Sequence, residues 1–153
     1  MSTQTTQQRL APAGARIDAR GPRFTAGVTA VALAAVLVSP PTVATVLIAV
    51  QAALFAVGAL AGVQHTPTAW VFRRFVRPRL AGTSELEDPQ PPRFAQAVGL
   101  VFAVVSLAGI LAGLTTLALA AAGLALVAAL LNSLFGFCLG CEMYLLLKRT
   151  TSA

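Results

Sequence analysis

The two cysteines of the chain, Cys138 and Cys141, stand three residues apart within the segment 135–144. On a helix, residues i and i+3 lie on the same face, so the two sulfurs can meet. Such a pair can close a disulfide, bind a soft metal ion or pass a sulfur atom between thiols, and thiolate is the reactive form. If Gly136 ends the preceding helix, the pair lies at the start of a new helix, where thiolate is favoured.

Glu142 directly follows the second cysteine. Its charge opposes thiolate formation unless the carboxylate accepts the thiol proton. The candidate redox site is therefore Cys138, Cys141 and Glu142, with Cys138 as the attacking thiol and Cys141 as the resolving thiol. The simpler alternative is that both cysteines only pack between helices as small, polarizable side chains.

His65, the only histidine, is a candidate metal ligand together with Cys138 and Cys141. Its spacing from them follows no known zinc pattern, and anchoring a helix end beside Pro67 is the simpler role. The site prediction therefore includes no metal, and we expect no cofactor.

The composition determines which kind of protein must hold these residues. Of the 153 residues, 57% are hydrophobic and 10% charged, whereas soluble domains average about 45–50% and about 25%. A chain this short cannot bury so much apolar surface inside itself. A soluble enzyme, a disordered chain and a disulfide scaffold are excluded, which leaves a small integral membrane protein.

The charges mark out four membrane spans. No charged residue occurs between Arg23 and Arg73, nor between Arg93 and Glu142, and each interval is long enough for two helices of about 20 residues. Backbone groups in lipid must be satisfied within each segment, so the spans are helices. Pro40 and Pro41 mark the first turn, and Gly109, Gly113 and Thr115 the second. The predicted spans are 24–39, 42–63, 94–112 and 115–137.

The basic residues predict the orientation of these spans. All 11 Lys and Arg lie before the first span, between the second and third, or after the fourth. These three zones face the same side, which the positive-inside rule places in the cytosol. We expect a multi-pass protein of the bacterial cytoplasmic membrane with both termini cytosolic. Residues 1–20 form a flexible tail, and 21–150 a single membrane domain.

A shift of 70 residues aligns the two halves of the chain without a gap. Pro22-Arg23-Phe24 falls on Pro92-Arg93-Phe94, Thr45 on Thr115, and Leu47 on Leu117. We therefore predict an all-α membrane fold in which two helical hairpins repeat. Because each hairpin has two spans, the copies run parallel about an axis along the membrane normal.

The loop at 64–93 contains an amphipathic stretch. Between Trp70 and Leu80, apolar side chains alternate with Arg73, Arg74 and Arg77. We expect this stretch to lie in the membrane interface, with these arginines at lipid phosphates. Arginines beside a span need no other partner, so nucleic acid is not expected.

Several motifs together resemble a known family of uncharacterised bacterial membrane proteins, domain of unknown function 4395. They are Arg77-Pro78-Arg79-Leu80, Glu87-Asp88-Pro89, Pro92-Arg93-Phe94-Ala95-Gln96 and the segment from Gly136 to Tyr144 with both cysteines. The resemblance spans about residues 18–148. It implies a membrane fold, points to the cysteines as the site, and implies a link to thioredoxin-like proteins and sulfurtransferases. It implies no particular reaction.

Three functions fit these observations. The first is a cytosol-facing dithiol that exchanges electrons or sulfur with a thioredoxin-like or sulfurtransferase partner. The second is a component of a small-solute transporter or channel. The spans contain no ionisable residue, which argues against proton- or cation-coupled transport. The third is a structural subunit that docks a partner. Whether the protein is an enzyme, and whether it forms a homo-oligomer, stay open.

Overall fold

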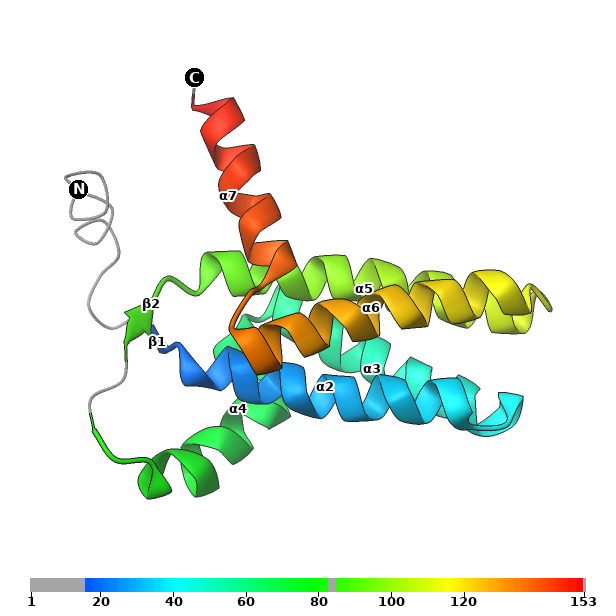
Figure 1. Cartoon of the computed structure of the whole chain (residues 1–153), viewed down its shortest axis with the longest axis horizontal. Coiled ribbons are helices and arrows are strands. Elements are labelled where there is room, and N and C mark those ends of the chain that lie inside the picture. Colours follow the sequence, from blue (N-terminus) through cyan, green and yellow to red (C-terminus); the bar gives the residue numbers. More distant parts are fainter. Residues whose placement is uncertain (1–15, 83–84, 153) are drawn as a thin grey trace.

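The computed structural model describes residues 16–82 and 85–152, and the first 15 residues of the tail predicted at 1–20 lie outside the described residues. Four long helices run side by side, and short elements gather at one end of the bundle (Figure 1). In chain order the elements are β1 (Ile17–Asp18), α2 (Arg20–Val38), α3 (Pro41–Leu60), η1 (Val63–His65), α4 (Pro67–Val71), η2 (Phe72–Val76), η3 (Arg77–Arg79), β2 (Leu86–Glu87), α5 (Gln90–Leu111), α6 (Thr115–Phe135) and α7 (Leu139–Thr151).

Helices α2, α3, α5 and α6 are each long and apolar enough to cross a membrane, so the all-α membrane fold is confirmed. Both α2 and α5 begin four residues before the spans drawn from the sequence. The reason is that Pro22, Pro91 and Pro92 lie in the first helical turn, where a missing N–H costs nothing. At the other end, α3 stops at Leu60 and Gly62 takes a φ of 108°.

The two halves interlock rather than packing as separate hairpins. The most extensive contacts join α3 to α5 and α2 to α6, with α5 against α6 next. The core between them holds Leu33, Ile48, Phe55 and Ala103. Where α5 meets α6, a Cβ on Gly109 would lie 2.9 Å from the backbone nitrogen of Ala118. Close approach at small residues is how membrane helices pack without a hydrophobic driving force.

The internal repeat is visible in these pairings. A shift of 70 residues carries the start of α2 onto the start of α5, and the α2–α6 contact corresponds to the α5–α3 contact. Arg93, at the start of α5, donates from Nε and Nη2 to the carbonyls of Ala59 and Leu60 at the end of α3, both at 2.7 Å. Its counterpart Arg23 places its guanidinium against Gly136 at the end of α6.

The repeat also includes a third, short helix. Phe24 packs on Phe72 and Phe94 packs on Tyr144, each pair with ring centroids 5.8 Å apart. Phe72 lies in the segment formed by α4, η2 and η3 (67–79), and Tyr144 lies in α7. Both short segments start from the same end of the bundle and leave it in opposite directions (Figure 1). Each half is therefore a three-helix unit.

The N-terminal residues that the structure describes are part of the fold. Ile17 and Asp18 pair antiparallel with Glu87 and Leu86, and the N–H of Ala19 donates to the carbonyl of Glu85 at 2.9 Å. Residues 17–20, which the sequence assigned to the tail, thus belong to β1 and the start of α2, because the loop that precedes α5 supplies backbone partners. This pairing ties the start of α2 to the start of α5.

Candidate functional site

The site begins where α6 ends. Gly136 has a φ of 68°, its N–H donates to the carbonyl of Asn132, and the N–H of Phe137 donates to the carbonyl of Leu131. Glycine is favoured at this left-handed C-cap, which satisfies the last carbonyls of the helix. The helix thus ends just before Gly136, which meets the condition for a new helix at the cysteines, and Cys138 comes two residues later.

Cys138 is the N-cap residue of α7 and is bonded to Cys141 in a disulfide, with Cα atoms 5.1 Å apart. The backbone of Cys138 is extended, with φ −91° and ψ 103°. The backbone N–H of Cys141 donates to Sγ of Cys138 at 3.2 Å. The sulfurs meet, as the spacing predicted, but by a different geometry: one cysteine precedes the helix instead of sharing a helical face with the other.

This position favours a thiolate at Cys138 when the pair is reduced. An N-cap side chain accepts a hydrogen bond from the third residue of its helix, and here that donor is the N–H of Cys141. The partial positive charge of the helix N-terminus adds to this. Glu142, in the first turn, is exposed and places a negative charge close by. Of the two cysteines, Cys138 is thus the one that the helix N-terminus stabilises as a thiolate.

The other half of the bundle contains the equivalent cap without a cysteine. Thr66 is the N-cap residue of α4, and its Oγ1 accepts from the N–H of Ala69 at 3.2 Å. A shift of 72 residues carries Thr66 onto Cys138 and Ala69 onto Cys141. The cysteine pair thus occupies a structural cap position that the other half fills with inert residues, which distinguishes the two halves chemically.

On one side of the disulfide lies a polar hollow of about 600 Å³. Its wall carries charged side chains of both signs around the two cysteines: Arg20, Arg23, Glu85, Glu87, Asp88 and Glu142. Burial raises the pKa of Glu87 above its usual value, the positive charge of Arg23 partly offsets this, and neighbouring carboxylates raise the pKa further. The carboxyl group of Glu87 therefore keeps its proton to higher pH than a free glutamic acid does.

The raised pKa of Glu87 predicts how the stability of the fold depends on pH. The folded protein keeps the proton of Glu87 to higher pH than the unfolded chain does. The free energy of unfolding therefore falls as the pH rises from the pKa of the unfolded state through that of the folded state, and it stays lower at higher pH. Glu87→Gln should therefore raise the melting temperature in detergent at about pH 7.5 but not at about pH 3, where Glu87 is almost fully protonated in both the folded and the unfolded state. Glu85→Gln, at an exposed position, is the control. Equal melting temperatures of Glu87→Gln and wild type at neutral pH would contradict the prediction.

On the other side of Cys138 lies an apolar cavity of about 300 Å³ between α2, α5, α6 and α7. Cys138 and Asn132 line both this cavity and the polar hollow, so they form part of the partition between the two. Besides Asn132, the side chains of the cavity wall with an amide or hydroxyl group are those of Gln96 and Thr29. Asn132, Gln96 and Glu87 were not predicted as site residues, although Gln96 and Glu87 lie in the family motifs, because only folding brings them to the cavity and the hollow beside Cys138.

His65 lies in the other half of the chain from the cysteines. Its Nδ1 is 2.8 Å from the carbonyl oxygen of Ala61, near the end of α3, and its side chain is exposed. Within residues 16–82 and 85–152, no three His, Cys, Asp or Glu side chains are grouped so that they could hold a metal ion. The structure thus does not assemble His65, Cys138 and Cys141 into one site, and it places His65 at a helix end.

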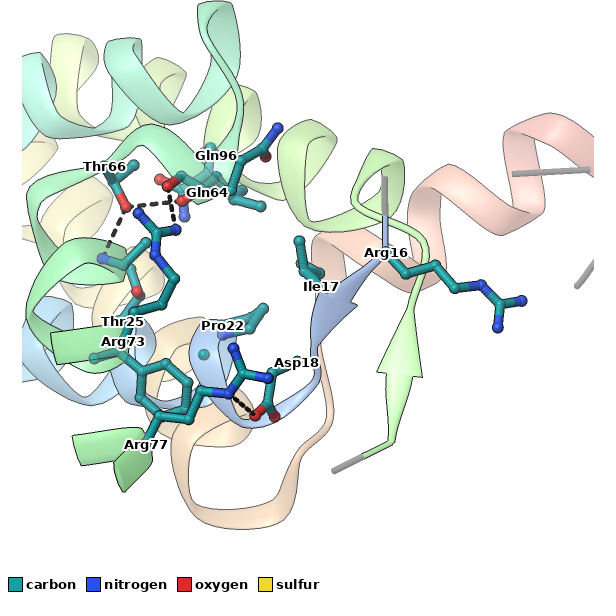
Figure 2. A pocket seen from close by; sticks show the side chains of 14 residues that line it. Arg16, Ile17, Asp18, Pro22, Thr25, Gln64, Thr66, Arg73, Arg77 and Gln96 are labelled. Atoms are coloured by element: carbon teal, nitrogen blue, oxygen red, sulfur yellow. Dashed lines mark hydrogen bonds and ion pairs between the residues drawn. The ribbon is translucent and has the colours of Figure 1, made fainter. Parts of the chain in front are cut away.

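The arginines of the 67–79 segment have different surroundings (Figure 2). Arg73 donates to the carbonyl of Gln64 at 2.6 Å, and Arg77 is 3.8 Å from a carboxylate oxygen of Asp18. Both line a pocket of about 200 Å³ beside the N-terminus of α4. Arg74 is exposed and makes no hydrogen bond or ion pair with the described part of the chain. Lipid phosphate is still the proposed ligand of Arg73, Arg74 and Arg77, and Arg74 is the freest of them to bind it.

Four long apolar helices with a disulfide-bonded Cys-x-x-Cys at one end define a small all-α membrane protein with a cysteine pair. The chain belongs to the family described as Domain of unknown function (DUF4395), whose model matches residues 17–149. No curated protein and no solved structure matches the chain. The family resemblance found in the sequence is confirmed, and the description of the family names no activity.

Proposed function

We propose that this protein is a thiol–disulfide or sulfur-transfer exchanger, in which Cys138 and Cys141 react reversibly with a thioredoxin-like or sulfurtransferase partner. The observation that carries the proposal is the position of Cys138: an N-cap bonded to Cys141 and exposed to a charged hollow. A cysteine pair that only packed between helices would have no need of a cap position. The hollow offers a soluble partner the polar, charged surface that the apolar bundle lacks.

The exchange is balanced in two steps. The Cys138 thiolate attacks a disulfide of the partner, a mixed disulfide forms, and one partner thiolate leaves. Cys141 then loses its proton and attacks Sγ of Cys138, which forms the disulfide seen here and releases the second partner thiolate. Glu87 and Glu142 line the same hollow and are the candidate proton acceptors. The reverse sequence reduces the pair.

The hollow faces the cytosol in this proposal. The basic residues gather at the end of the bundle that holds the cysteines, and the positive-inside rule places that end in the cytosol. Helix α7 carries exposed Leu139, Met143, Leu146 and Leu147 at helical spacing, followed by Lys148 and Arg149. Such a helix suits the membrane interface. The protein would then be a multi-pass protein of a bacterial inner membrane, with both termini cytosolic.

Trapping of the partner tests the proposal. Cys141→Ala leaves Cys138 without its resolving thiol, so a mixed disulfide with the partner should accumulate. Dithiothreitol should reduce it and release the partner. Cys138→Ala is the matched control, because its remaining thiol lies inside the helix and should trap far less. Non-reducing gels followed by identification of the captured protein give the measurement. No trapping by either variant would favour the structural-subunit alternative, and equal trapping by both would contradict the attacking role of Cys138.

A further inference from the structure

The apolar cavity reaches from the disulfide into the depth of the bundle. Leu124 is its deepest lining residue on α6, and from there to Phe135 the helix rises about 16 Å at 1.5 Å per residue. Most of the wall is apolar, including Phe55, Phe102 and Leu124. Leu124 is also 59% exposed on the outside of the bundle. The cavity thus lies beside the lipid-facing surface, so a lipid-soluble molecule can reach it from the bilayer.

Two side-chain amides line the wall of the cavity. Asn132 stands on the partition with Cys138, and Gln96 lies on the facing helix α5. In the described part of the chain, neither side-chain amide makes a hydrogen bond with another residue. Amide N–H groups donate to carbonyl oxygens. A hydrocarbon chain would leave both amides unpaired, whereas a flat, apolar molecule with carbonyl oxygens would use them.

A volume of about 300 Å³ is at the lower end of the range of small-molecule sites and accommodates one substituted ring. We propose that this cavity binds a lipid-soluble quinone, and that the cysteine pair passes electrons between the quinone and the thiol partner in the polar hollow. This inference rests on the proposed exchange function and adds its second substrate. Asn132 and Gln96 would donate to the quinone oxygens, and Cys138 would face the ring.

The reaction is balanced as dithiol plus quinone giving disulfide plus hydroquinone. The Cys138 thiolate adds to the ring, and a carbon–sulfur bond forms. The Cys141 thiolate then attacks Sγ of Cys138, so the sulfur–sulfur bond forms while the carbon–sulfur bond breaks. The ring leaves with the electron pair and takes up two protons, one for each thiol proton released. Asn132 and Gln96 are positioning residues, since their amides would stabilise negative charge on the ring oxygens.

The test uses the full chain in nanodiscs, reduced and freed of reductant, with decylubiquinone as the probe. Quinone absorbance should fall as the disulfide reforms, with one quinone reduced for each cysteine pair. Ala128→Phe, which fills the cavity, should slow this reaction about tenfold or more. Val127→Phe, at the adjacent position that is 53% exposed, should not. Asn132→Leu, which keeps the size of the side chain, should raise the KM for quinone.

A second reaction separates this inference from the exchange function on which it rests. The same preparations are assayed for reduction of the disulfide by thioredoxin from the side of the hollow. If wild type reacts with thioredoxin but not with quinone, or if both phenylalanine variants react with quinone equally, the quinone site is wrong and the exchange function stands. If wild type reacts with neither, the exchange function is wrong as well. Loss of both reactions in Ala128→Phe alone would indicate misfolding, and Asn132→Leu then decides.

Discussion

Gly140→Ala should uncouple α7 from the bundle and slow every reaction of the cysteine pair. A Cβ on Gly140 would lie 2.6 Å from both Cα and Cβ of Ala95 on α5, so backbone must move. Overpacking of this kind costs about 1–3 kcal/mol. Because 1.4 kcal/mol is a factor of ten, the balance between docked and displaced α7 should shift by about five- to a hundredfold. Cys138 precedes Gly140 by two residues and would move with it.

Two quantities are measured. One is the rate at which the reduced protein attacks a chromogenic aromatic disulfide, and the other is its affinity for the partner that the Cys141→Ala variant captures. Gly123→Ala is the matched control, because nothing lies within 4 Å of the position where its Cβ would stand. Both variants should keep the helical content of the wild type. If Gly140→Ala reacts and docks like Gly123→Ala, then the close contact between α7 and α5 does not position the site.

Arg93→Ala should cause the largest loss of stability among single arginine substitutions. Its guanidinium holds the carbonyls of Ala59 and Leu60 at 2.7 Å and so joins the end of one repeat to the start of the other. Hydrogen bonds to charged groups contribute about 1.5–3 kcal/mol each. Partial exposure and incomplete additivity reduce the sum, so we expect a loss of about 2–4 kcal/mol.

Unfolding in mixed micelles measures this loss. Arg93→Lys keeps the charge but not the two-pronged geometry, and it should fall between wild type and Arg93→Ala. Arg149→Ala, in the last turn of α7, should change stability by about 0.5 kcal/mol or less. A loss in Arg93→Ala no greater than that in Arg149→Ala would mean that the repeats are not held together at this point.

The four helices could be predicted because charge and apolar length are properties of the sequence itself. The third helix of each repeat could not be seen in a gapless alignment. Thr66 corresponds to Cys138 and Phe72 to Tyr144 only with a shift of 72 residues, whereas the first helices require 70. The gapless shift placed His65 on Phe135 and so hid the equivalence of the two caps.

Of the candidate site, only the pairing of the two cysteines could be predicted from the sequence. The spacing of Cys138 and Cys141 indicated that their sulfurs could meet, and Gly136 indicated a helix break. The partition between a polar hollow and an apolar cavity depends on α2, α5 and α6 packing around α7. Asn132 therefore carried no local signal, and Glu87 stood out only as part of a family motif, because each reaches the cysteines only through neighbours far away in the sequence.

We propose that the cysteine pair is a reversible dithiol that reacts on the cytosolic side. Alkylation of vesicles of both orientations with a membrane-impermeant maleimide tests it most directly. Reduced Cys138 and Cys141 should label only in inside-out vesicles, lose labelling after mild oxidation and regain it with dithiothreitol. Labelling from the outer side, labelling that oxidation leaves unchanged, or no labelling of the reduced protein would contradict the claim.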